Sequence, residues 1–234
     1  MRERYGKRRD GDDNRNRRKP VEQVEWVPRT ELGRKVKSGE VKDIDEILNK
    51  SIRIKEAPIV DHLIPNIETD FIQIGQSKGK FGGGKRKLSW VTQKKTAEGS
   101  AIKFSSMAVI GNKAGIIGIG IGKSGESVPA KTKAEKVARL NLMKIRTGCG
   151  SWECACNGDH SIPFAVEGRE GSVWVKIMPA PKGTGLAINE TGKQILSLAG
   201  IKDVWSVTMG QTPTRHNLAK AIFKALRQLR TVKQ

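Results

Sequence analysis

The sequence has few of the residues on which several classes of protein depend. It contains one Tyr and five Phe, which disfavours binding of single-stranded nucleic acid by serial aromatic stacking. Its three cysteines are too few and odd in number for a disulfide framework, and indicate reduced thiols. We find no apolar stretch long enough to cross a bilayer and no signal-peptide layout. These features predict a cytoplasmic protein with no membrane partner.

Histidine is equally scarce, since the chain contains only His62, His160 and His216. Asp61 and Asp159 directly precede His62 and His160, but none of the three histidines has an Asp or Glu neighbour that suggests activation. No arrangement of nucleophile, base and acid is evident either. We therefore expect no enzymatic activity.

The chain instead carries a large excess of positive charge. It has 44 Lys and Arg against 24 Asp and Glu, a net charge of +20 and a pI near 10.1. The excess extends along the whole length of the chain. A field of this sign attracts polyanions, and release of condensed counterions drives binding to nucleic acid. The charge predicts a nucleic-acid partner, with a solvated basic surface as the alternative.

The chain divides into four predicted segments, and the first two contain the N-terminal half of an α+β protein. Residues 1–65 form a basic arm (1–20) followed by a helical extension, and residues 66–147 form a first α+β module. The extension has predicted helices at Glu31–Lys37 capped by Thr30, Asp43–Leu48 with an Asp43/Glu46 capping box, and Pro58–Ile64. The module has predicted strands at Phe71–Ile74, Ala101–Ile110 and Gly115–Ile121, a Gly/Lys-rich loop at 77–87, and a helix after Pro129 reaching Ile145.

The other two segments are a connector at 148–163 and a second α+β domain at 164–234. The β-β-α-β-α order of this domain predicts a second layered unit. Its expected elements are strands at Phe164–Glu167, Ser172–Met178 and Val204–Met209, a helix ending at Ala199, and a final helix with Leu218, Ile222, Ala225 and Leu229 on one face.

One strand of the first module has a face made of glycine. Gly118, Gly120 and Gly122 alternate with isoleucines, so a packed helix or a ligand must approach the backbone closely. The segment Gly118–Ser124 also resembles the end of a phosphate-binding loop. That motif needs Gly where Ile117 stands, so a nucleotide site is the weaker interpretation.

The connector holds a group of metal-ligand residue types. Cys149, Cys154, Cys156 and His160 lie within twelve residues, and three thiolates with one imidazole match a closed tetrahedral zinc site. The spacing C-x4-C-x-C-x3-H is not the paired C-x2-C of common zinc ribbons. Two interpretations remain open: one structural zinc ion, or three buried thiols beside a satisfied histidine.

Several long motifs resemble those of the family of small-subunit ribosomal protein five in its archaeal form. They are Gly148-Cys-Gly-Ser-Trp-Glu-Cys-Ala-Cys156 with His160-Ser-Ile-Pro-Phe164, Pro179-Ala-Pro-Lys-Gly-Thr-Gly-Leu186, Ala199-Gly-Ile-Lys-Asp-Val-Trp-Ser206, and the hairpin from Val109-Ile-Gly-Asn112 to Lys123. The resemblance covers most of the chain from about Trp26 to the final helix. It implies a double-stranded-RNA-binding-like module followed by an α+β domain with a left-handed crossover.

The resemblance also implies a function in translation. The partners would be small-subunit ribosomal RNA, messenger RNA at its entry site, and the neighbouring small-subunit proteins four and eight. The protein would be ribosome-bound and would influence translational accuracy. The predicted RNA-binding residues, from the basic clusters and from the resemblance, are Lys94, Lys95, Gly99, Ser100, Lys103, Lys113, Lys123, Arg139, Arg146, Lys182 and Arg215. The alternatives are a P-loop-like nucleotide-binding protein and a free-standing zinc-dependent RNA-binding protein.

Overall fold

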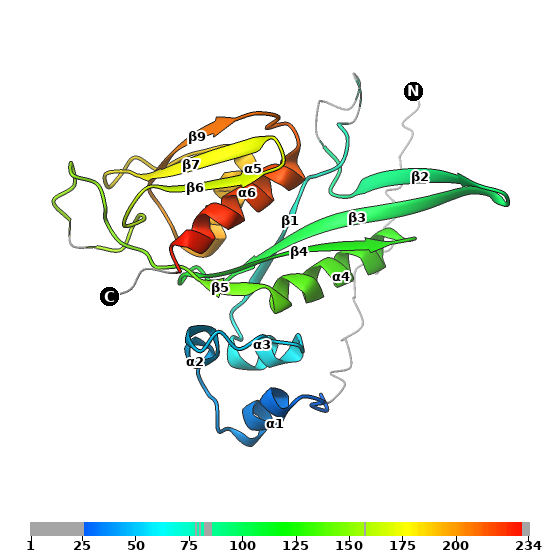
Figure 1. Ribbon diagram of the computed structural model, residues 1–234, viewed down its shortest axis with the longest axis horizontal. Helices are drawn as coiled ribbons and strands as arrows, with labels where there is room; N and C mark the ends of the chain where they lie inside the picture. Colours follow the sequence, from blue (N-terminus) through cyan, green and yellow to red (C-terminus); the bar gives the residue numbers. More distant parts are fainter. Residues whose placement is uncertain (1–25, 78, 80, 82–85, 157, 231–234) are drawn as a thin grey trace, which may run out of the picture.

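The computed structural model describes residues 26–77, 79, 81, 86–156 and 158–230. Two stacked layers of sheet and helix make up the body, and three short helices lie beside them (Figure 1). The predicted basic arm at 1–20 lies outside the described residues. So do Lys78, Lys80 and Lys85 of the predicted basic loop.

The helical extension consists of α1 (Glu31–Ser38), α2 (Ile44–Asn49) and α3 (Pro58–Leu63). The cap of α1 is as predicted, because Thr30 Oγ1 accepts the N–H of Gly33 at 3.1 Å. The predicted capping box of α2 is wrong, since the Asp43 side chain makes no capping hydrogen bond. This helix of six residues is positioned instead by its buried Ile44, Ile47 and Leu48, which pack on two apolar clusters.

The first sheet has the strand order β1-β3-β4-β5, with β2 paired to the far part of β3. Its strands are β1 (Glu68–Ile72), β2 (Trp90–Thr96), β3 (Gly99–Gly111), β4 (Ile116–Ser124) and β5 (Leu142–Lys144). Helix α4 (Ser127–Leu140) covers one face. The predicted extension of this helix to Ile145 is wrong, because Leu142–Lys144 instead pairs with β4 as an edge strand.

The glycine face of β4 lies directly beneath α4. A Cβ atom added at Gly118 would lie 2.4 Å from Ala138 O, and one added at Gly120 would lie 2.2 Å from Ala138 N. The close approach is therefore made by a packed helix and not by a ligand. Gly118–Ser124 is continuous strand, so the phosphate-loop interpretation is wrong.

The second sheet has the order β6-β7-β9-β8 and carries two helices. The elements are β6 (Val166–Glu170), β7 (Val173–Pro179), β8 (Leu186–Ala187), α5 (Glu190–Ala199), β9 (Val204–Met209) and α6 (Arg215–Gln228). The short β8 runs parallel to β9, and α5 connects them. The predicted α+β class is confirmed, while the left-handed sense of this crossover stays a prediction.

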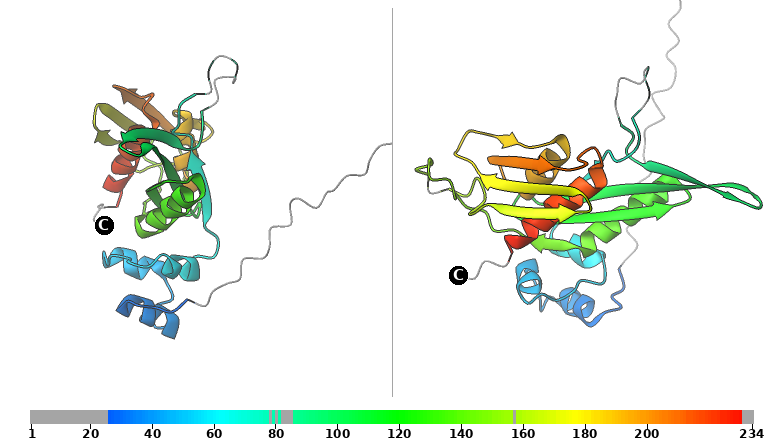
Figure 2. Two further views of the ribbon diagram at one scale, coloured as in Figure 1. Left: turned by 90° about the vertical axis from the view of Figure 1, so that its right-hand side faces the viewer. Right: turned by 45° about the horizontal axis from the view of Figure 1, so that its top comes forward.

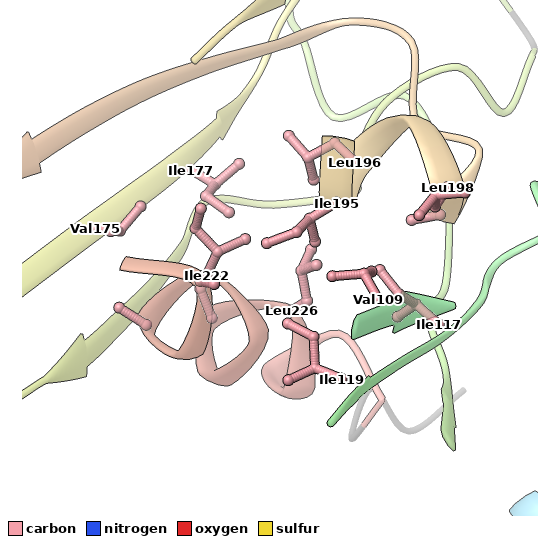
Figure 3. Close-up of a cluster of buried hydrophobic side chains, with 14 of the residues drawn as sticks. Val109, Ile117, Ile119, Val175, Ile177, Ile195, Leu196, Leu198, Ile222 and Leu226 are labelled. Carbon is pink, nitrogen blue, oxygen red and sulfur yellow. The ribbon is translucent and has the colours of Figure 1, made fainter. Parts of the chain in front are cut away.

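The two sheets share one hydrophobic core. Val109, Ile117 and Ile119 of the first sheet face a cluster that includes Ile195 of α5 and Ile222 of α6 (Figure 3). Helix α6 also covers the inner face of β6 and β7, and α5 packs against α6 and the first sheet. The core thus continues across the connector, and the predicted domain boundaries stay predictions.

Candidate nucleic-acid interface and metal centre

A long two-stranded ribbon extends from the body of the protein (Figures 1 and 2). It is formed by β2 and the first half of β3, and every residue from Val91 to Lys103 is exposed. Thr96 lies opposite Gly99 at the tip, where Thr96 Oγ1 donates to Gly99 O at 2.8 Å. Because no other part of the described chain covers the ribbon, both of its faces are available to a partner.

Three lysines of the ribbon were predicted to bind RNA. Lys94 lies opposite Ala101, and Lys103 lies opposite Thr92, so these two lysines share one face of the ribbon. Lys95 lies opposite Ser100 on the other face. None of the three forms an ion pair with another residue of the described chain. The ribbon therefore presents free positive charge on both faces.

Sequence reasoning missed β2 as a strand. Its residues are exposed throughout, so it lacks the alternation of apolar and polar residues by which a half-buried strand is recognised. The hydrogen bonds to β3 hold it instead. The lysines of this element were recognised in the sequence as RNA-binding residues and gave no signal for a strand.

The remaining predicted RNA-binding residues fall into two groups. Three cations are engaged in ion pairs within the chain, namely Lys113 with Glu68, Arg139 with Asp61 and Glu135, and Arg215 with Glu190. Three others, Lys123, Arg146 and Lys182, have exposed side chains and no ion-pair partner in the described chain. Lys123, Arg146 and Lys182 are therefore better placed to bind phosphate than the three cations that already form ion pairs.

The connector brings its four predicted metal ligands together. One ligand atom from each of Cys149, Cys154, Cys156 and His160 lies within 4.8 Å of all the others. Cys156 Sγ is 3.0 Å from both Cys154 Sγ and His160 Nε2. Three sulfur atoms and one imidazole nitrogen are the donor set of a closed structural zinc site, and their proximity fits one ion.

A buried acid supports the histidine of this cluster. His160 Nδ1 lies 2.8 Å from Asp203 Oδ2, and both side chains are more than 90 % buried. A hydrogen bond from Nδ1 to a carboxylate leaves Nε2, which faces the cysteines, free to bind a metal. Sequence reasoning did not find this partner of His160, because Asp203 lies 43 residues away.

One thiol of the cluster is poised to ionise. The hydrogen bond with Cys156, together with the backbone N–H of Lys182, lowers the pKa of Cys154 from 9.0 to about 6. Only a thiolate binds a metal ion. The environment of Cys154 therefore favours the ligand form near neutral pH.

The loop Pro181–Gly185 contacts this cluster. The backbone N–H groups of Gly183 and Gly185 both donate to Asp203 Oδ1, at 3.1 and 2.8 Å. These N–H groups do not open a helix, because the loop leads into β8 and α5 begins only at Glu190. The side chain of Lys182 nevertheless remains exposed.

Among the described residues, we find no helix that combines the length and the apolar character needed to span a membrane.

Known proteins resemble the chain in both halves. A family model described as "Ribosomal protein S5, N-terminal domain" matches residues 90–146, and one described as "Ribosomal protein S5, C-terminal domain" matches residues 168–234. The "Small ribosomal subunit protein uS5" of Nanoarchaeum equitans is 46% identical over 209 residues, 89% of this chain and 90% of the relative. Those of Methanosphaera stadtmanae and Thermofilum pendens are 46% and 42% identical, over 89% and 87% of this chain and 85% and 94% of the relatives.

These matches bear on the predicted identity and on the expected absence of enzymatic activity. Both family models are of ribosomal protein domains, and the three relatives are all named as proteins of the small ribosomal subunit. None of these names describes an enzyme. The chain therefore belongs to the ribosomal protein S5 family, as the motifs indicated, and is a structural ribosomal protein and not an enzyme.

Proposed function

We propose that the protein is a constituent of the small ribosomal subunit that binds small-subunit ribosomal RNA through its β2–β3 ribbon. The observation that carries this proposal is the free charge of Lys94, Lys95 and Lys103 on both faces of an exposed ribbon. Phosphates crowd both sides of a cleft between RNA helices, and a thin cationic ribbon fits such a cleft by shape and charge. Gly99 and Ser100 at the tip allow the backbone to approach the RNA closely.

The finer assignments come from the family resemblance. On this basis we propose that the protein lies at the messenger entry, where Lys and Arg contact messenger RNA and the ribbon influences translational accuracy. The neighbours are the small-subunit proteins four and eight, and the compartment is the cytoplasm. An apolar strip on the outer face of β9 supports a protein neighbour, because Trp205, Val207 and Met209 are 38, 40 and 58% exposed.

Reversing the charge of Lys94 and Lys95 together should weaken assembly into small subunits. Two phosphate contacts would become repulsive, so RNA affinity should fall and the slope of log K against log salt should decrease by about two. A tagged Lys94→Glu/Lys95→Glu variant is sedimented from lysate at magnesium low enough to separate the subunits. We expect less of it in the small-subunit peak than of the wild type, after a moderate salt wash.

The matched control is Lys42→Glu/Lys50→Glu, which changes the net charge equally at two exposed lysines of the helical extension. Equal sedimentation of both double variants would show that only total charge matters, and would refute the role of the ribbon. Recovery of the wild type at the top of the gradient would favour a free-standing RNA-binding protein instead.

We also propose that Cys149, Cys154, Cys156 and His160 hold one structural zinc ion. The support is the Cys3His donor set within 4.8 Å and the carboxylate that orients the histidine. When bound, the ion cross-links a connector that contains no regular helix or strand among its described residues. We expect one zinc per chain by atomic emission from protein purified without chelator, and a metal-free purified protein would refute the site.

A further inference from the structure

The Asp203 carboxylate contacts two parts of the molecule at once. Its Oδ2 lies 2.8 Å from His160 Nδ1, and its Oδ1 accepts the N–H groups of Gly183 and Gly185. The residue is only 5% exposed. A buried carboxylate is costly unless hydrogen bonds satisfy it, so both sets of bonds are needed to keep it there. Asp203 therefore bridges the Cys/His cluster and the loop Pro181–Gly185.

One further connection fastens the same loop to the connector, and another fastens Ala180, the residue before the loop. The backbone N–H of Lys182 donates to the sulfur of Cys154. Ser161 Oγ donates to Asp203 O at 2.5 Å and accepts the N–H of Ala180 at 3.3 Å. The connections therefore start from Cys154, which is a candidate ligand, from Asp203, and from Ser161, which follows His160. Cys154 and Asp203 thus link the loop to the candidate metal centre, beside the bond from Val204 N–H to Gly185 O and the bonds within the loop.

The outward side of this unit is cationic. Lys182 and Lys202 are exposed, whereas Asp203 is buried and turned inward. Gly183 and Gly185 have φ values of +93° and +73°, conformations that strongly favour glycine. Pro181 and the two glycines set the shape of a tight loop whose tip offers an ammonium group to a phosphate.

We infer that metal binding at the Cys/His cluster fixes the loop Pro181–Gly185 through Asp203 and Cys154, and so presents Lys182 to the phosphate backbone of RNA. This inference rests on the zinc ion and the RNA partner proposed above. Cys154 and His160 are fixed in position when they share one ion. Without it, the anchors of Lys182 and Asp203 move independently, and the loop loosens. Asp203 is a positioning residue in this scheme, since it acts through His160 and the loop.

The variant Asp203→Asn tests the bridge. An amide of the same shape accepts hydrogen bonds on only one of its two terminal atoms, so it cannot serve both His160 and the glycines. We expect zinc affinity to fall about 10- to 100-fold, as for other carboxylates behind a metal-binding histidine. The control is Asp159→Asn, next to the same histidine, which is exposed and has no described contact. It should bind zinc as the wild type does.

Amide hydrogen exchange of the full chain measures the loop directly. Chelation of the wild type, or Asp203→Asn, should speed exchange at Gly183 and Gly185 by about tenfold or more, with Ala114, whose N–H bonds locally to Asn112 Oδ1 in the β3–β4 hairpin, unchanged. If the protein binds zinc but the exchange rates of Gly183 and Gly185 do not change on chelation, the coupling is refuted and the zinc proposal stands. Equal acceleration at Ala114 would refute a local linkage, and absence of zinc would refute both proposals.

The RNA contact is tested in the same proteins by a double-mutant cycle. Lys182→Ala should lower the salt slope of ribosomal RNA binding by about one in the zinc-loaded wild type. The same change should have no effect in the Asp203→Asn background, where the loop is already released. An undiminished effect of Lys182→Ala in that background would overturn the inference, and loss of RNA binding by the unaltered chain would overturn the proposed function.

Discussion

Replacing Gly120 with Ala should destabilise the protein by about 3 kcal/mol, the upper part of the usual range for overpacking. The added Cβ would lie 2.2 Å from Ala138 N and 2.3 Å from Ala134 O. Both neighbours belong to the backbone of α4, so they cannot turn aside as a side chain does. The helix must move away from the sheet, and its buried Ala130, Ala134 and Ala138 then lose their contacts.

Urea unfolding of the two purified proteins measures this effect through the change in midpoint at constant slope. The matched control is Gly125→Ala, five residues further along the chain, where an added Cβ has nothing within 4 Å. That substitution should change the free energy of unfolding by no more than about 1 kcal/mol, in the stabilising direction. Equal midpoints for the two variants would contradict the account of the glycine face.

The glycine face of β4 shows what kind of feature a sequence reveals, because its close approach to another group was predicted. Alternation of Ile and Gly is a local pattern, and its physical meaning, close approach to a strand, does not depend on the partner. The sequence left open whether that partner was a helix or a ligand. The structure answers with α4, whose alanines at every fourth position match the glycines opposite.

The failures have equally specific causes. Leu142 continues the apolar spacing of α4, yet it lies in β5, because pairing with Gly118 satisfies the backbone of the edge strand. Tertiary pairing here overrides a helical period. Asp203 escaped notice for a different reason: its partners, His160 and two loop glycines, are distant in sequence. No spacing rule relates residues that only the fold brings together.

The four candidate metal ligands were found from composition and proximity in sequence. The groups that form hydrogen bonds to these ligands were not. Three cysteines and one histidine within twelve residues are visible without a fold. The carboxylate behind the histidine and the N–H from Lys182 come from the second domain, so they become visible only in three dimensions. Because Asp203 directly precedes β9, the site links the connector to β9. The four ligands, which all lie within the connector, do not by themselves imply this link.

Removing zinc should lower the melting temperature by about 8–16 °C. A ligand present at about a thousand times its Kd stabilises the folded state by about 4 kcal/mol. Each kcal/mol corresponds to about 2–4 °C for a protein of this size. Thermal melts followed by circular dichroism, with and without a strong chelator, measure the difference. Identical melts would contradict a structural ion.

The same difference should shrink as the pH falls. Folding lowers the pKa of Cys154 from 9.0 to about 6, so the folded protein binds fewer protons than the unfolded chain between these values. The contribution of this thiolate is therefore complete above pH 9 and is lost as the pH falls through about 6. Protons compete with the metal for the same sulfur. A difference that grew towards pH 5 would contradict this assignment.

The variant Cys156→Ser separates the ion from the other effects of chelation. Cys156 Sγ lies 3.0 Å from both Cys154 Sγ and His160 Nε2, so its loss removes a central ligand. The melting temperature of the Cys156→Ser variant should match that of the chelated wild type and should not respond to chelator. Ser151→Ala, a change in the same connector outside the ligand set, should melt and respond like the wild type. A chelator response that persisted in Cys156→Ser would place the metal elsewhere, because a three-ligand remnant cannot hold the ion as a closed site does.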